Sequence, residues 1–324
     1  MLYRKKEEPK LSEELFQNPT SEYRGTPFWA WNCKVTEEQI DFQTEALKEM
    51  GIGGAHIHCR TGMNIPYMSE EFLGRVAYAH EKLTEKQMLT WLYDEDRWPS
   101  GYGGGYVTKD SRYRMRFLVF SPEEIPEGVP EKRGRDISAA VIVRSEKRTL
   151  LKRYAVCLNE NGTMDDYQVL EKGETCPDGY DPWYAYLEIS GDNVWFNNQA
   201  YVNTLDPEAI SCFLKVTHEK YAKKLGNDFG KGIPAIFTDE PQFAHKTRLE
   251  HAHDRKVQFL PYTDDFEETY QKAYGETFLN GLPEIFWERS REPVSKTRYQ
   301  YHDHIAERFA DAFADTIGGW CREH

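Results

Sequence analysis

The stretch Pro234-Ala-Ile-Phe-Thr-Asp-Glu-Pro241 is a short apolar run that ends in two carboxylates and a proline. Its apolar residues begin after Gly232 and predict a buried strand. Proline lacks the N–H that a sheet ladder needs, so the strand must end near Asp239 and Glu240. Parallel α/β folds and barrels carry their chemistry at the carboxyl ends of such strands. An isolated Asp-Glu-Pro run is equally consistent with a solvated turn, and the rest of the chain has to decide between the two.

Three earlier stretches also predict strands, and the segments between them predict helices. The strands are expected at 26–32, 52–60 and 88–96. A helix follows the first strand from the capping box Thr36–Gln39, and a helix follows the second strand from Ser69. Strands and helices that alternate at this spacing indicate a parallel sheet with helical crossovers.

The hydrophobic period changes between 112 and 199, which predicts a β-rich insertion. Its strands are expected at 117–120, 137–144, 150–158 and 184–196. The insertion separates the third strand from its helix. That helix is expected from Asp206, with Pro207 at its first position, to Leu225. The strand quoted above then follows as the fourth.

The predicted fold class is α/β, the first half of a (β/α)8 TIM-type barrel with a β-rich insertion between the third strand and its helix. Expected divisions are an irregular lead over 1–25, the first three βα strands over 26–111, the insertion over 112–199, and the third helix, fourth strand and following helices over 200–324. A parallel sheet is covered on both faces, so we expect a longer enzyme whose carboxy-terminal half completes the barrel. A half-barrel that pairs with a second copy is the alternative. With only half a barrel present, the edge strand at 233–238 and the apolar stripe along 305–320 are expected to lack partners within this chain.

The composition narrows the function classes. With 41 basic and 54 acidic residues the net charge is −13, which disfavours nucleic acid and anionic membranes as partners. No apolar run approaches the roughly 18 residues of a membrane helix, and no secretion signal is visible after Met1, so we expect a cytoplasmic protein. The 6 cysteines form no CxxC pair, which predicts free thiols.

The four strand ends carry the candidate substrate-binding and catalytic side chains. In chain order these are Trp29, Trp31 and Asn32; His56, His58 and Arg60; Asp94 and Asp96 with Arg97 and Trp98 of the following loop; and Asp239 and Glu240. Carboxyl ends of barrel strands converge on one cleft, so these groups are expected to meet. A ligand rich in hydroxyls would satisfy them, and Trp98 with Tyr102 could stack on a sugar face. The alternative is that Asp94 and Asp96 form ion pairs with Arg60 or Arg97.

Several of these motifs together resemble a known enzyme family. They are Pro27-Phe-Trp-Ala-Trp-Asn32, Met50-Gly-Ile-Gly-Gly54, His58-Cys-Arg-Thr-Gly62, Trp91-Leu-Tyr-Asp-Glu-Asp-Arg-Trp-Pro-Ser-Gly101 and Phe237-Thr-Asp-Glu-Pro241. The sequence is similar here to the α-L-rhamnosidase family 106 of glycoside hydrolases and its uncharacterised relatives. The resemblance covers about 26–110 and 200–245. It implies a multi-domain glycosidase with a (β/α)8 catalytic domain, often calcium-assisted, that acts on α-linked deoxysugars in an oligosaccharide.

The resemblance also assigns roles to the carboxylates. Glycoside hydrolysis normally uses one acid with a raised pKa and a second carboxyl as base or nucleophile. In barrel glycosidases the acid commonly follows the fourth strand in an Asn-Glu-Pro-like run, which implies Glu240 here. Asp239 stands where Asn is usual, so it either bonds a hydroxyl or acts on the pKa of Glu240 by like charge. The second carboxylate is expected from a later strand.

Two other functions stay open on the residues alone. His56-Ile-His58 at a strand end is also how metal-dependent amidohydrolase barrels begin their site, because imidazoles at i and i+2 can grip one zinc ion. The chain is also consistent with a non-catalytic carbohydrate-binding relative. The tryptophans of the first strand and the loop after Asp94 favour a sugar ligand over both alternatives.

Overall fold

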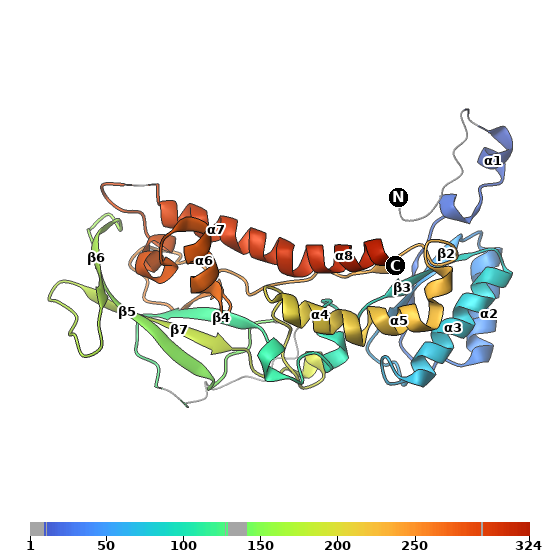
Figure 1. Cartoon of the computed structure of the whole chain (residues 1–324), viewed down its shortest axis with the longest axis horizontal. Helices are drawn as coiled ribbons and strands as arrows, with labels where there is room; N and C mark the ends of the chain where they lie inside the picture. Colours follow the sequence, from blue (N-terminus) through green and yellow to red (C-terminus); the bar gives the residue numbers. More distant parts are fainter. Residues whose placement is uncertain (1–9, 11, 127, 129–140, 293) are drawn as a thin grey trace. The chain divides into compact units, whose positions relative to one another are not determined.

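The computed structural model describes residues 10, 12–126, 128, 141–292 and 294–324. These residues form two compact units (Figure 1). The parallel-sheet unit contains the described residues up to Val107 together with Ser211–Pro241 and Gly319–His324. The antiparallel-sheet unit contains Thr108–Ile210 and Gln242–Gly318.

Four strands of the parallel-sheet unit lie side by side. They are β1 Phe28–Trp31, β2 Gly54–Cys59, β3 Leu89–Tyr93 and β8 Ile236–Phe237, in the order β1-β2-β3-β8, and every pair is parallel. The prediction that four separated segments form neighbouring parallel strands is therefore confirmed. Within the described residues the sheet is open and forms no closed barrel. The half-barrel accordingly stays a prediction.

Helices connect these strands as the capping signals indicated. The connecting α-helices are α2 Glu37–Glu49, α3 Glu70–Glu85, α4 Pro207–Val216 and α5 His218–Leu225. Helix α1 Glu13–Gln17 precedes β1, and α8 Thr316–Glu323 follows β8. Short 3-10 turns lie at Ser21–Tyr23, Gly103–Gly105 and Gly226–Asp228. The reciprocal bonds of the capping box at Thr36 are both present, and the Ser69 hydroxyl accepts the Phe72 N–H. The helix expected to begin after Asp206 is divided at Thr217 into α4 and α5.

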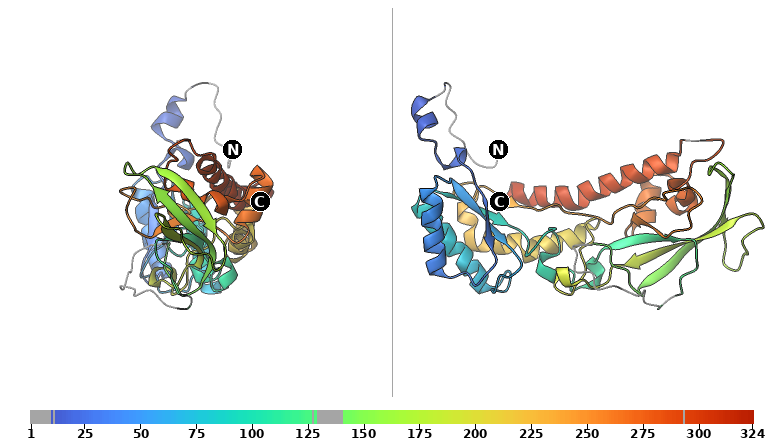
Figure 2. Two further views of the ribbon diagram at one scale, coloured as in Figure 1. Left: turned by 90° about the vertical axis from the view of Figure 1, so that its left-hand side faces the viewer. Right: turned by 180° about the vertical axis from the view of Figure 1, so that it is seen from behind.

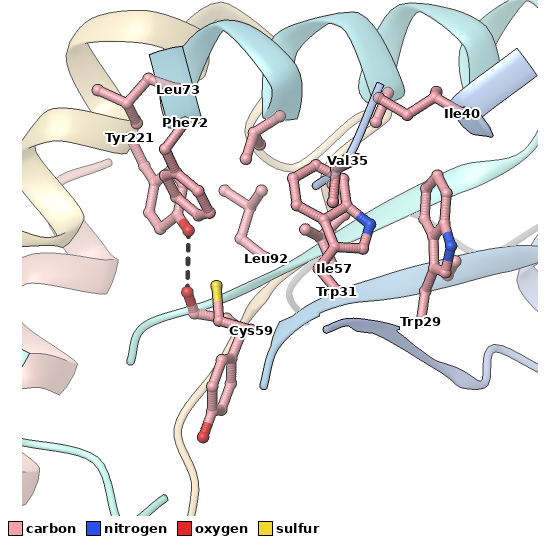
Figure 3. Packing of buried hydrophobic residues seen from close by; sticks show 14 of the residues in the cluster. Trp29, Trp31, Val35, Ile40, Ile57, Cys59, Phe72, Leu73, Leu92 and Tyr221 are labelled. Carbon is pink, nitrogen blue, oxygen red and sulfur yellow. Dashed lines mark hydrogen bonds between the residues drawn. The ribbon is translucent and has the colours of Figure 1, made fainter. Parts of the chain in front are cut away.

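One face of the parallel sheet forms a hydrophobic core with α2, α3 and α5 (Figures 2 and 3). The core side chains from the strands include Trp31, Ile57 and Leu92. They pack against residues of the helices such as Phe72 and Tyr221, all almost fully buried. Side chains alternate between the two faces of each strand, so His56 and His58 of β2 point to the opposite face. That face is where a site can form.

The antiparallel-sheet unit is built on five strands in the order β6-β5-β7-β4-β9. They are β4 Arg116–Ser121, β5 Arg148–Leu158, β6 Met164–Leu170, β7 Asp181–Ile189 and β9 Gln258–Pro261. Its helices are α6 Phe266–Tyr274 and α7 Lys296–Phe309, which continues as a π-helix over Ala310–Asp315, with 3-10 segments at Ser111–Tyr113, Val194–Phe196 and Phe278–Ile285.

The expected β-rich region is present, with differences in its strands. β6 was not predicted, and the strand expected at 184–196 ends at Ile189. Most of the strand expected at 137–144 lies outside the described residues, and 141–144 is not a strand. β9 joins the sheet from beyond the fourth parallel strand by pairing with β4.

The apolar stripe near the carboxyl end is not unpartnered, so that prediction was wrong. Ile305 packs in the core of the antiparallel-sheet unit, and Ala312 and Phe313 are also buried. Trp320 contacts the rings of His218 and Phe229 in the parallel-sheet unit. No helix among the described residues combines the length and the hydrophobicity needed to cross a membrane. The predicted free thiols are found at Cys33, Cys59, Cys157, Cys176 and Cys321.

Candidate functional site

Side chains from β2 and β3 meet Asp239, the second residue after β8. The carboxylate of Asp239 accepts a 3.1 Å hydrogen bond from the hydroxyl of Tyr93, the last residue of β3. The Nε2 atom of His58 in β2 lies 3.9 Å from the same oxygen, Asp239 Oδ2. The carboxyl ends of three adjacent parallel strands thus converge on one carboxylate.

His58 is held as a neutral imidazole. Its ring stacks on Phe28 at 4.6 Å between centroids and meets the edge of Tyr93 at 4.0 Å. Burial lowers the pKa of His58 to about 4, and the charges of Arg60 and His56 act in the same direction. Its buried Nε2 atom makes no hydrogen bond to any described residue. A neutral imidazole facing Asp239 can accept or donate one hydrogen bond to a ligand hydroxyl.

Asp239 and Glu240 occupy different environments although they are neighbours in sequence. Asp239 is partly buried, and this burial raises its pKa, with a smaller contribution from the charge of Glu240. The Tyr93 hydrogen bond and Arg60 act in the opposite direction. Glu240 is exposed, and its Oε2 accepts a 2.8 Å hydrogen bond from the indole Nε1 of Trp98.

The main chain at Glu240 adopts a conformation that glutamate rarely takes. Its φ angle is +41°, in the left-handed region. Such a residue costs of order 1–3 kcal/mol and persists where surrounding contacts determine it. The adjacent contacts are the hydrogen bonds of Asp239 to Ser100 and that of the Trp98 indole to the Glu240 carboxylate. This outlier supports a functional role for the position.

A buried carboxylate fixes the loop after β3 to the end of β8. Asp94 accepts hydrogen bonds of 2.6 Å from the hydroxyls of Ser100 and Thr238. The Ser100 N–H also donates a 2.8 Å bond to the Asp239 carbonyl oxygen, and the Ser100 hydroxyl oxygen accepts a 2.9 Å bond from the Asp239 N–H. Burial raises the pKa of Asp94 to about 7, against the effect of the two hydroxyl donors. Nε2 of buried His218 lies 3.7 Å from Asp94 Oδ2.

Two of the expected substrate-binding residues lie on the wrong face of the sheet. Trp29 and Trp31 point toward the helices, where they are 8% and 2% exposed (Figure 3). The Trp29 indole donates to Gln43 of α2, and Phe72 of α3 packs on Trp31. A sugar ring has no surface to contact there, so we leave both tryptophans out of the proposed site.

The acidic residues after β3 are also structural. Asp94 is fully buried behind the loop, and Asp96 forms an ion pair with Arg97 at 3.0 Å, which is one of the alternatives stated above. Tyr102 is fully buried as well and cannot stack on a ligand. These placements correct the expectation that Asp94 and Asp96 bind substrate.

The remaining expected residues lie near the strand ends. Arg60 and Asn32 are exposed after β2 and β1. His56 is half-buried, stacks on Trp91, and its Nδ1 atom lies 3.1 Å from the Thr26 carbonyl oxygen. Arg60 and His56 therefore stay in the proposed site as groups that flank His58.

Two contributors to the site were missed from the sequence. Tyr93 supplies the hydrogen bond to Asp239, and Phe28 supplies the stack on His58. The register pairs Phe28 with His56, and His56 with Trp91. With this register, alternation along β1 and β3 places Phe28 and Tyr93 on the face of the two histidines, but the register itself could not be read from the sequence.

The described residues offer no group of three or more His, Cys, Asp or Glu side chains arranged to hold a metal ion. His56 and His58 therefore have no third zinc ligand among the described residues. These residues also offer no cluster of carboxylates for the calcium ion that the family resemblance implies. The metal-dependent alternative needs ligands from outside the described residues, so it stays a prediction.

Comparisons with known proteins identify a solved structure with a similar fold. No protein-family model matches the chain, and no curated protein matches it. Among solved structures it resembles the rhamnosidase from Novosphingobium sp. PP1Y, with a TM-score of 0.58 and 13% sequence identity. The alignment covers 98% of this chain and 46% of that one, so the chain spans about half the length of the matched protein. The similarity shows that the two share a mixed α/β fold.

Proposed function

We propose that the chain carries part of the active site of a glycoside hydrolase, with Glu240 as the general acid. The observation that carries the proposal is the pair of adjacent carboxyls at the end of β8, one partly buried against Tyr93 and one exposed beside Trp98. The family resemblance of the motifs and the fold shared with a rhamnosidase support the same class of reaction. We propose an oligosaccharide with an α-linked deoxysugar as the substrate.

Each residue of the proposed site has a distinct role in the reaction. Glu240, exposed at the strand end, donates a proton to the glycosidic oxygen as the bond to the leaving group breaks. Asp239, which is partly exposed, accepts a hydrogen bond from a sugar hydroxyl, and the buried Nε2 atom of neutral His58 lies 3.9 Å from its Oδ2. Phe28, exposed at 56%, offers a ring face to the apolar side of a sugar.

A second carboxylate is required to complete the reaction. It either attacks the anomeric carbon or activates a water molecule, depending on its separation from Glu240. Asp94 is buried and bonded to Ser100 and Thr238, so it cannot take this role. We propose that the second carboxylate comes from a later strand, as the family resemblance implies.

The test compares Glu240→Gln and Asp239→Asn in the full-length protein. Glu240→Gln should keep the fold and sugar binding but lose about 10²–10⁴ in kcat/KM on a natural glycoside, because it cannot donate a proton. An activated glycoside with a good leaving group needs less protonation, so its hydrolysis should be partly retained. Asp239→Asn should be milder and should weaken substrate binding, seen as a higher KM.

A matched control is available in Glu219→Gln. Glu219 also accepts a hydrogen bond from an indole, that of Trp320 at 2.7 Å, but it lies on α5. Its replacement should leave kcat/KM unchanged. If Glu240→Gln retains more than about a tenth of the natural activity, Glu240 is not the acid. Sugar binding without any turnover by the wild type would instead identify a non-catalytic carbohydrate-binding protein.

A further inference from the structure

A buried carboxylate inside the loop after β3 holds that loop in one conformation. Glu95 is fully buried, and its two oxygens accept four main-chain hydrogen bonds. The donors are the N–H groups of Asp96 at 2.9 Å, Gly101 at 2.9 Å, Gly103 at 2.8 Å and Gly104 at 2.6 Å. The burial raises the pKa of Glu95, and the amide donors oppose that rise. Four converging amides stabilise the ionised form of a carboxylate.

The glycines of this loop are required by its shape. Gly101, Gly103 and Gly104 have φ angles of +133°, +58° and +63°. Other residues rarely adopt these angles, so the amides could not converge on one carboxylate with ordinary side chains in place. A Cβ atom on Gly104 would also lie 2.8 Å from the ring of Tyr67. The run Gly101-Tyr-Gly-Gly-Gly105 therefore supplies three of the four amides that bind the Glu95 side chain.

The loop is anchored by hydrogen bonds on the carboxyl side of Trp98. On the carboxyl side, Ser100 bonds the main chain of Asp239 and the side chain of Asp94. Beyond Ser100, the glycine amides bind Glu95. Trp98 lies between the strand end and these anchors, and its indole Nε1 donates 2.8 Å to Glu240 Oε2. The loop thus presents one N–H donor to one oxygen of the candidate acid.

We propose that Trp98 is a positioning residue for Glu240 and that Glu95 holds the loop that presents it. This inference rests on the proposed function of Glu240. An indole N–H can only donate, so the oxygen that it contacts must act as an acceptor. The carbonyl oxygen of a carboxylic acid is a better acceptor than its hydroxyl oxygen, so the indole bond to Oε2 favours a protonated Glu240 with its proton on Oε1. Trp98 in this way favours one oxygen for proton delivery and restricts the side chain to one orientation.

The kinetic test uses Trp98→Phe in the full-length protein, which keeps an aromatic ring and removes the donor. It should lower kcat on a natural glycoside by about 10- to 100-fold with KM changed less than about threefold. On an activated glycoside the loss should nearly disappear, because proton delivery no longer limits the rate. In the Glu240→Gln background, Trp98→Phe should cause no further loss. Trp320→Phe, which removes the matched indole donor to Glu219, should leave kcat unchanged.

A spectroscopic readout separates this inference from the proposed function. The indole N–H resonance of Trp98 in ¹⁵N–¹H spectra, assigned by its absence in Trp98→Phe, should move in Glu240→Gln. Glu95→Gln should also shift or broaden it and reduce kcat. Where Glu95→Gln does not fold, the Trp98 variants still decide the question.

Two results would overturn the inference alone. One is an indole resonance that does not respond to Glu240→Gln. The other is a Trp98→Phe loss that is equal on natural and activated glycosides or that persists in Glu240→Gln. A moved resonance together with a Glu240→Gln enzyme that is still active would refute the proposed function and leave the Trp98–Glu240 contact established.

Discussion

The hydroxyl of Tyr93 donates a 3.1 Å hydrogen bond to the carboxylate of Asp239, and this bond joins the ends of β3 and β8. It favours the ionised form of Asp239, whereas burial and the nearby Glu240 charge favour the protonated form. The charge of one candidate site residue therefore depends on a side chain from the neighbouring strand.

Tyr93→Phe should raise the pKa of Asp239 further, because the carboxylate loses its donor while its burial remains. A ¹³C NMR titration of the Asp239 carboxyl carbon in the two proteins measures this change. Tyr154→Phe is the matched control, since it removes a buried tyrosine hydroxyl that bonds the Leu279 carbonyl. Each variant should lose about 1 kcal/mol of stability. An Asp239 pKa that stays constant or falls in Tyr93→Phe would show that the bond has no electrostatic effect.

His58 should make the protein less stable in mild acid. Burial lowers its pKa to about 4 in the fold, against 6.5 for the free side chain. Between these values the unfolded chain binds more protons, so the contribution of His58 to stability is present above about pH 6.5 and is lost as the pH falls toward 4. Buried His218, whose pKa is lowered to about 3, acts in the same direction.

Urea denaturation at a series of pH values from 7 to about 4.5 tests this expectation. His58→Gln removes the titrating group, so its free energy of unfolding should decrease less than that of the wild type over this range. His245→Gln replaces an exposed histidine and should follow the wild type. Parallel curves for His58→Gln and the wild type would mean that His58 is not buried as a neutral group.

The placement of the strands could be predicted because each has a local signal. The run from Ile233 to Phe237 is apolar and is followed by Pro241, and the capping residues Thr36 and Ser69 begin the helices that separate the strands. β9 has no comparable signal. It is four residues long and forms only when Phe259 and its neighbours meet β4, far earlier in the chain.

The candidate site was predicted less well. Alternation shows which residues of a strand share a face of the sheet, but it does not show whether that face packs on the helices or faces a ligand. Trp29 and Trp31 do share a face, yet that face packs on the helices rather than on a ligand. For Asp94 and Asp96 the alternation argument did not apply, because β3 ends at Tyr93 and the following residues enter a loop. The hydrogen bonds to Asp94 come from Ser100 and Thr238, which no sequence pattern connects with Asp94.

Asp94→Asn should change how stability depends on pH. Burial raises the pKa of Asp94 to about 7, well above the 3.8 of the free side chain, so the fold binds the extra proton between these values. Its contribution to stability is therefore present below about pH 4 and is lost as the pH rises through 7.

Asparagine cannot titrate, so between pH 5 and 8 the wild type should lose more stability than Asp94→Asn, by roughly 1–3 kcal/mol. At both pH values the variant forfeits one of the two hydroxyl bonds from Ser100 and Thr238, because its amide can accept at only one end. Denaturation at the two pH values compares the differences. A wild type that gains stability relative to the variant on going to pH 8 would contradict a raised pKa.

The left-handed main chain at Glu240 gives a final prediction that needs no substrate. Glu240 has φ +41°, a region that costs residues with a Cβ atom but not glycine. Glu240→Gly and Glu240→Ala both remove the carboxylate and its bond to Trp98, and they differ only in the Cβ atom. The left-handed penalty of about 1–2 kcal/mol exceeds the entropic cost of glycine, about 0.5–1 kcal/mol, so the glycine variant should be the more stable by roughly 1 kcal/mol. Thermal and urea denaturation of the two proteins measure this difference. An alanine variant as stable as the glycine variant would mean that the main chain relaxes out of the left-handed region once the carboxylate is gone. In that case the Trp98 bond holds Glu240 in place, whereas a glycine advantage assigns the strain to the turn between Asp239 and Pro241.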